Sequence, residues 1–82
     1  MITRNVIMRN QKDVMEFVRA VEQYPYTVEV SLGGETMNAK SVLGMLALGF
    51  NRVMKMEIQA DAADDLLAAV GRFICTQFGQ AV

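Results

Sequence analysis

The fold follows from one stretch of the chain, YTVEVSLGGETMN at residues 26–38. In its first half apolar side chains alternate with polar ones, and a period of two is typical of a strand with one buried face. Gly33 and Gly34 come next, and two glycines can adopt the positive φ angles of a tight hairpin turn. Residues 35–38 can then pair back as a short strand. The stretch therefore predicts a β-hairpin with one apolar face.

The segments on either side of the hairpin have helical periodicity. Upstream, Asn10 can cap a helix that Pro25 prevents from continuing. Downstream, a short helix is predicted over residues 41–48, with Ser41 as its N-cap or first-turn residue and Gly49 as its stop. The apolar stripe of the upstream helix consists of Val14, Phe17, Val18, Val21 and Tyr24.

Three more elements complete the predicted order β-α-β-β-α-β-α. A first strand covers residues 2–8, and residues 54–60 alternate as a strand with one apolar face. A final helix begins at an Asp61 cap, and its apolar stripe consists of Ala63, Leu66, Leu67, Val70, Ile74 and Phe78. Strands with one apolar face need helices packed on that face. We therefore expect one α/β (α+β) domain over residues 1–82, an open-faced β-sandwich, although periodicity alone also admits a ferredoxin-like split β-α-β arrangement.

Composition bounds the partners and the setting of the protein. A chain of 82 residues with 52% hydrophobic and 21% charged residues has enough apolar material for one small globular core. A net charge of −1 gives no long-range field for binding phosphates, so we expect neither nucleic acid nor membrane as a partner. The longest apolar stretch, residues 42–50, is far shorter than the roughly 20 residues of a membrane span, and no secretory signal is recognisable. We expect a cytoplasmic protein.

The residue types exclude most catalytic chemistry. The chain has no histidine and one cysteine, so it lacks the usual general base, the commonest zinc ligand and any internal disulfide. We expect Cys75 to be a small buried hydrophobic residue on the last helix. The acidic residues Asp61, Asp64 and Asp65 are typical of a helix start and not of a calcium loop. No catalytic residue, metal or cofactor is predicted, and the protein is not expected to be an enzyme.

Residues 37–48, MNAKSVLGMLAL, together with the element order, resemble the HPr family, the small phosphocarrier proteins of the bacterial sugar phosphotransferase system. The likeness extends over nearly the whole chain. It includes the pair Phe17-Val18 in the first helix and the sequence Ile58-Gln59-Ala60 before the last one. The resemblance implies a four-stranded antiparallel sheet in the order 1-4-2-3, with three helices on one face.

The chain departs from this family at the start of the first helix. HPr proteins carry there a histidine that takes the phosphoryl group, followed by an arginine and a proline. Counting back from Phe17-Val18 puts Asn10 at the histidine position and Lys12 at the arginine position. An amide nitrogen cannot accept a phosphoryl group, because its lone pair is delocalised into the carbonyl. Lys12 could still hold an anion near the helix N-terminus, or be a solvated surface lysine.

Ser41 matches the serine that, in HPr proteins of many Gram-positive bacteria, an ATP-dependent kinase phosphorylates. A phosphate there would add about −1.5 to −2 charges beside helix amides that favour negative charge. The alternative is that Ser41 serves only as an N-cap.

The residues after Ser41 favour a protein-binding role. Val42, Leu43 and Leu46 lie on the opposite side of the short helix from Met45 and Leu48, and both sides are apolar. A helix over a sheet can bury only one side, so some of this apolar area should remain exposed as a contact patch. The HPr resemblance implies that Val42, Leu43 and Leu46 form this patch, and Lys12 and Lys40 are expected as further partner-binding residues. Burial under neighbouring loops is the alternative.

The resemblance therefore implies a regulatory HPr-like protein that cannot carry phosphohistidine, similar to the Crh-type paralogues that lack the histidine and keep the serine. In such relatives the seryl-phosphorylated form is a corepressor in carbon catabolite control. The implied partners are HPr kinase/phosphorylase and a catabolite-control transcription factor. The alternative is an HPr-fold interaction or oligomerisation module, such as a homodimer, without phosphorylation.

Overall fold

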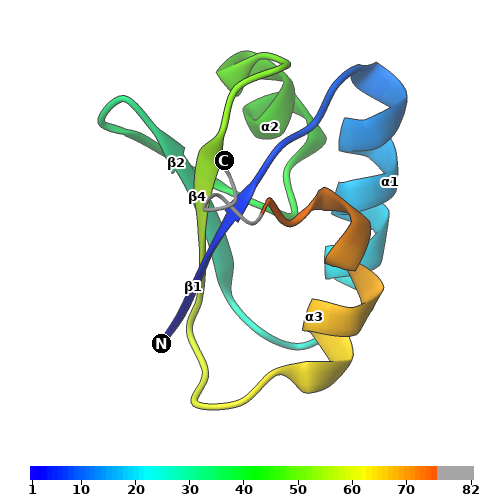
Figure 1. The fold of residues 1–82 in the computed structure, drawn as a ribbon, viewed down its shortest axis with the longest axis vertical. Coiled ribbons are helices and arrows are strands. Elements are labelled where there is room, and N and C mark those ends of the chain that lie inside the picture. Colours follow the sequence, from blue (N-terminus) through cyan, green and yellow to red (C-terminus); the bar gives the residue numbers. More distant parts are fainter. Residues whose placement is uncertain (76–82) are drawn as a thin grey trace.

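A computed structural model describes residues 1–75 of the chain (Figure 1). The elements follow the predicted order, and a 3-10 turn is added at the end. They are β1 (Ile2–Val6), α1 (Gln11–Glu22), β2 (Val28–Leu32), β3 (Glu35–Asn38), α2 (Val42–Leu48), β4 (Met54–Ile58), α3 (Asp64–Ala69) and the 3-10 turn (Gly71–Phe73).

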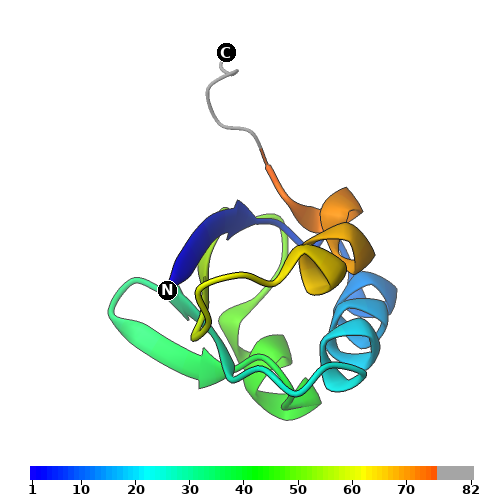
Figure 2. The same ribbon diagram turned by 90° about the horizontal axis from the view of Figure 1, so that it is seen from below.

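The four strands form one antiparallel sheet in the order β1-β4-β2-β3. Gly33 and Gly34 have φ angles of 58° and 88°, which confirms the predicted hairpin turn between β2 and β3. All three α-helices cover the same side of the sheet (Figures 1 and 2). This is the open-faced sandwich that the HPr resemblance implies, and the ferredoxin-like alternative is not adopted.

The core lies between the sheet and the helices. From α1, the buried side chains are Val14, Phe17, Val18 and Val21, which is the stripe that helical periodicity predicts apart from half-buried Tyr24. The sheet contributes the apolar side of its alternating strands, chiefly Val28, Val30, Met54, Met56 and Ile58. Among the described residues no polar or charged side chain is buried. The core therefore rests on apolar packing.

The final helix is shorter than predicted. It ends at Ala69 and gives way to the 3-10 turn, after which Ile74 forms a β-bridge with Val6 and the Cys75 N–H donates to the Asn5 carbonyl at 2.8 Å. Gly71 weakens a helix by about 1 kcal/mol relative to alanine, and the outer edge of β1 offers backbone partners instead. The apolar spacing that continues to Ile74 therefore reflects edge pairing at that residue, and predicted Phe78 lies outside the described residues.

Two further expectations about the end of the chain are wrong. Cys75 lies half-exposed beside β1 and not on a helix. The N-cap of α3 is Ala63 and not Asp61, and no side chain caps this end. Asp65 lies in the first turn, where it accepts hydrogen bonds from Leu66 N–H at 2.8 Å and from the Tyr26 hydroxyl at 2.9 Å. This last bond raises the pKa of Tyr26 and ties α3 to the start of β2.

The uncovered face of the sheet holds a pair of like charges. Glu29 of β2 and Glu57 of β4 lie directly opposite each other, and Lys55 offsets only part of their repulsion at 3.5 Å from Glu57. Like charges at such positions destabilise a sheet by a fraction of a kcal/mol. We expect Glu29→Gln to raise the free energy of unfolding in urea by about 0.2–1 kcal/mol. Glu35→Gln, opposite Leu32, is the control, and an equal gain there would contradict this explanation.

Candidate functional site

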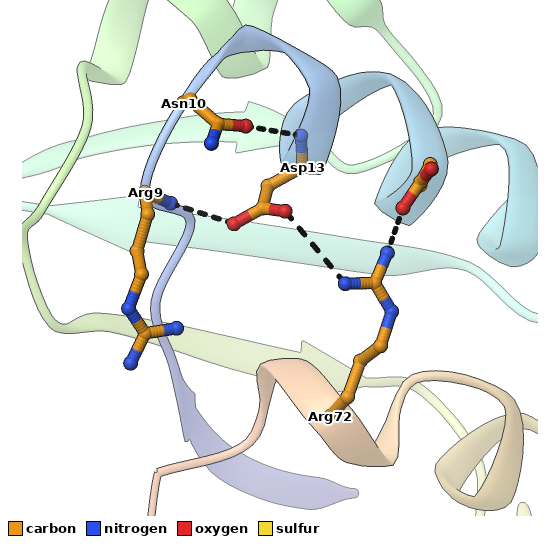
Figure 3. Close-up of polar contacts among 5 residues, drawn as sticks. Arg9, Asn10, Asp13 and Arg72 are labelled. Atoms are coloured by element: carbon orange, nitrogen blue, oxygen red, sulfur yellow. Dashed lines mark hydrogen bonds and ion pairs between the residues drawn. The ribbon is translucent and has the colours of Figure 1, made fainter.

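The loop before α1 is organised around Asn10. Its backbone is extended, and its side-chain carbonyl accepts a hydrogen bond from Asp13 N–H at 2.9 Å, which confirms it as the N-cap (Figure 3). The Asp13 carboxylate accepts from the N–H of Arg9, the residue before the N-cap, at 2.9 Å. The pair of bonds differs from a capping box, in which the carboxylate would accept from the N–H of the N-cap residue itself. The side-chain oxygen of Asn10 therefore caps the N-terminus of α1, and the amide nitrogen of Asn10 is not a nucleophile.

Arg72, in the 3-10 turn near the end of the described chain, forms ion pairs with the first turns of α1. Its guanidinium contacts Asp13 at 3.7 Å (Figure 3) and Glu16 by a shorter ion pair. It also lies 4.1 Å above the centre of the Phe73 ring. Arg72 thus balances two of the acidic residues in the first turns of α1. Within residues 1–75, Arg9 and Lys12 form no ion pair, and Lys12 is exposed, which agrees with both predicted alternatives for this residue. Sequence analysis missed Arg72 because it is remote from α1 along the chain.

Ser41 lies at the N-terminus of α2, half-exposed. Its hydroxyl oxygen accepts a hydrogen bond from Gly44 N–H at 3.1 Å, and its own N–H donates to the Asn38 carbonyl at 3.0 Å. The prediction that Ser41 is an N-cap is confirmed. Because the side chain is held at the edge of the fold and not in its interior, the hydroxyl can be reached from solvent.

The α2 outer face, which we define as Val42, Leu43 and Leu46, is uneven. Leu43 is 80% exposed, whereas Val42 and Leu46 are half-buried and pack against the core. Met45 and Leu48 on the other side are buried, as the helical spacing predicts. The exposure of Leu43 agrees with the predicted contact patch, whereas the partial burial of Val42 and Leu46 agrees with the burial alternative.

Lys40 differs from a free surface lysine. Its ammonium donates to the Tyr24 carbonyl at 3.0 Å, which links the approach to α2 with the turn after α1. In this geometry the charge is turned toward the fold. A direct contact between Lys40 and a partner would require that hydrogen bond to break.

The loop after α2 carries a further exposed apolar side chain. Asn51 N–H donates to the Met8 carbonyl at 2.7 Å, so the C-terminal end of α2, and not the Ser41 end, is tied to the loop that holds Asn10. Phe50, one residue earlier, is 38% exposed. Sequence analysis did not single out Phe50, because exposure in an irregular loop leaves no periodic signal.

Within the described part of the chain, a cavity of about 470 Å³ lies on the uncovered side of the sheet. It is lined by Asn5, Ser31, Leu32, Gly33, Gly34, Thr36, Val53, Met54 and Lys55. Among the described residues, no group of three or more acidic, histidine or cysteine side chains could hold a metal ion. No helix within residues 1–75 is long and apolar enough to cross a membrane.

A four-stranded antiparallel sheet in the order β1-β4-β2-β3, covered by helices on one side, is the open-faced sandwich of HPr proteins. The sequence model described as "PTS HPr component phosphorylation site" matches residues 10–75. The chain therefore belongs to the HPr family of the phosphotransferase system.

Solved structures of HPr proteins share this fold. HPr-C-His from Thermoanaerobacter tengcongensis is similar with a TM-score of 0.75 and 21% identity over 100% of both chains. HPr from Bacillus anthracis str. Ames is similar with a TM-score of 0.71 and 18% identity, over 90% of this chain and 96% of that one. An HPr dimer from T. tengcongensis has a TM-score of 0.63 and 21% identity, over 79% and 83%. No curated protein matches the sequence.

Proposed function

We propose that this member of the HPr family is a regulatory binding protein that does not carry phosphohistidine and is switched by phosphorylation of Ser41. The observation that carries the proposal is the contrast between two helix starts. The N-cap of α1 is Asn10 in a chain without histidine, whereas the N-cap of α2 is a half-exposed serine hydroxyl. Only the second can accept a phosphoryl group.

The phosphorylation is a transfer from ATP to the Ser41 oxygen. The Oγ–phosphorus bond forms, the bond from the γ-phosphorus to the bridging oxygen of ADP breaks, and a base of the kinase takes the hydroxyl proton. The product carries about −1.5 to −2 charges and additional acceptor oxygens. The Gly44 N–H already points at Oγ, so the modified side chain needs no refolding of α2.

The phosphorylated protein would act by binding and not by turnover. Its proposed partners are HPr kinase/phosphorylase, which would modify it, and a catabolite-control transcription factor, which would read it. The α2 outer face supports this reading, because its exposed leucine lies two residues from the modified serine. Lys12 adds an exposed positive charge at the start of α1, whose preceding loop is hydrogen-bonded to the C-terminal end of α2.

Incubation with ATP, Mg²⁺ and HPr kinase tests the proposal. Intact-mass analysis should show one added phosphoryl group on the wild type and none on Ser41→Ala. The chain has only two serines, so Ser31→Ala is the matched control and should be modified like the wild type. An unmodified wild-type protein, or a phosphoryl group that persists in Ser41→Ala, would overturn the assignment.

The second candidate function is an interaction or oligomerisation module with the HPr fold and no phosphorylation. It is favoured by the 80% exposure of Leu43, and a dimer is known for a structurally similar HPr. Light scattering over a range of concentrations separates the two candidates. The oligomerisation module requires a fraction of dimer that rises with protein concentration, whereas a strict monomer counts against it.

A further inference from the structure

Gly44 occupies a confined position one turn after Ser41. A Cβ atom added there would lie 3.2 Å from the Ser41 hydroxyl oxygen, 3.4 Å from the Ser41 Cβ and 3.4 Å from the Met37 Cβ. Gly71, by contrast, would place a Cβ in open space. Gly44 is thus the point at which α2 approaches both its own cap and β3.

The backbone does not require a glycine at this position. Gly44 is not among the glycines with positive φ, and it lies inside α2, where glycine costs about 1 kcal/mol relative to alanine. The advantage of glycine here is therefore the space that a side chain would fill. That space borders the hydroxyl oxygen of Ser41.

We propose that Gly44 is a positioning residue for the modification of Ser41, an inference that rests on the proposed phosphorylation. The missing Cβ has two effects. It lets the Ser41 hydroxyl remain in the orientation that accepts the Gly44 N–H, and it leaves room beside that hydroxyl for the oxygens of an incoming phosphoryl group.

A methyl group at position 44 would be held between two neighbours. The Met37 Cβ belongs to β3, where Met37 is paired with Val30, so it cannot move without moving the strand. The Ser41 side chain is attached by one rotatable bond and is the easier group to displace. A contact of 3.2 Å requires the hydroxyl oxygen to give by a few tenths of an ångström, which shifts the nucleophilic oxygen and distorts its hydrogen bond to the residue 44 amide. Because a misplacement of about 1 Å can cost about 100-fold in rate, a shift of this smaller size should slow phosphoryl transfer by about 3- to 5-fold.

The inference predicts slower phosphorylation of Gly44→Ala. We expect its initial rate with ATP and the kinase, followed by intact mass, to fall about 3- to 5-fold below the wild type. The matched control Gly71→Ala should remain within about twofold of the wild type, because its methyl group meets nothing. Met37→Gly in the Gly44→Ala background removes the confining Cβ and should recover part of the rate, although a glycine in a strand is destabilising.

A kinase-independent measurement accompanies the rates. In the wild type, NMR should show a hydrogen-bonded residue 44 amide and one dominant χ1 rotamer of Ser41, and Gly44→Ala should weaken the hydrogen bond and change the rotamer populations. Equal rates for wild type and Gly44→Ala, or an unchanged amide and rotamer, would overturn the role of Gly44 while leaving Ser41 as the modified residue. Absence of any modification of the wild type would instead overturn the proposed function, and this inference with it.

Discussion

Replacing Phe17 with alanine is expected to lower the free energy of unfolding by about 3–5 kcal/mol, a large share of the stability of a domain of this size. Phe17 is fully buried in α1, and its ring meets the Phe73 ring edge-on with centroids 5.4 Å apart. The contact joins the first helix to the 3-10 turn. Truncation would leave a cavity at this junction and remove the aromatic pair.

Urea unfolding followed by circular dichroism measures this loss. Met15→Ala is the matched control, because Met15 lies on the same helix and is 40% exposed. Its loss should stay below about 1 kcal/mol. Similar losses for the two variants would mean that the Phe17–Phe73 junction does not stabilise the fold as the packing indicates.

Replacing Leu43 with aspartate is expected to weaken binding of the Ser41-phosphorylated protein to the proposed catabolite-control transcription factor by about 30-fold or more. The figure corresponds to the roughly 2 kcal/mol of an interface hot spot. A carboxylate at the most exposed point of the α2 outer face would be buried without a partner in the complex, next to the negative phosphate. Stability should hardly change, because 80% of Leu43 is exposed in the free protein.

Calorimetric titration of the phosphorylated variants with the transcription factor measures this effect. Val53→Asp is the control: Val53 is 48% exposed but lines the cavity on the uncovered side of the sheet. It should bind like the wild type. Equal weakening by both variants would point to a general charge effect, and normal binding of Leu43→Asp would remove the α2 outer face from the interface.

Features set by neighbours in the sequence could be predicted. The hairpin turn depends on the adjacent Gly33 and Gly34, and the caps at Asn10 and Ser41 each join a side chain to an amide three residues later. The stripe of α1 is buried, apart from half-buried Tyr24, as its spacing indicates. Such interactions are complete within one turn or one strand pair, so the local order of residues contains the information they need.

The strand order 1-4-2-3 depended on the family resemblance, because alternation shows which face of a strand is buried and not which strand lies beside it. The last helix shows that a clear helical spacing can also mislead. Its spacing suggested a helix to Phe78, yet Ile74 pairs with Val6 near the start of the chain. A periodic pattern cannot distinguish these outcomes when a free sheet edge competes for the backbone.

By itself, the sequence determined the one-sided strands, the capped starts of α1 and α2 and the lack of a phosphoryl-accepting histidine, since these depend on residue type and near neighbours. Only the tertiary structure decided that Arg72 binds Asp13 and Glu16, that Lys40 is held by the Tyr24 carbonyl, and that Leu43 stays exposed while Val42 and Leu46 do not. These outcomes join groups distant along the chain. Which groups come into contact depends on how the helices pack on the sheet, and the order of residues along one element does not determine that packing.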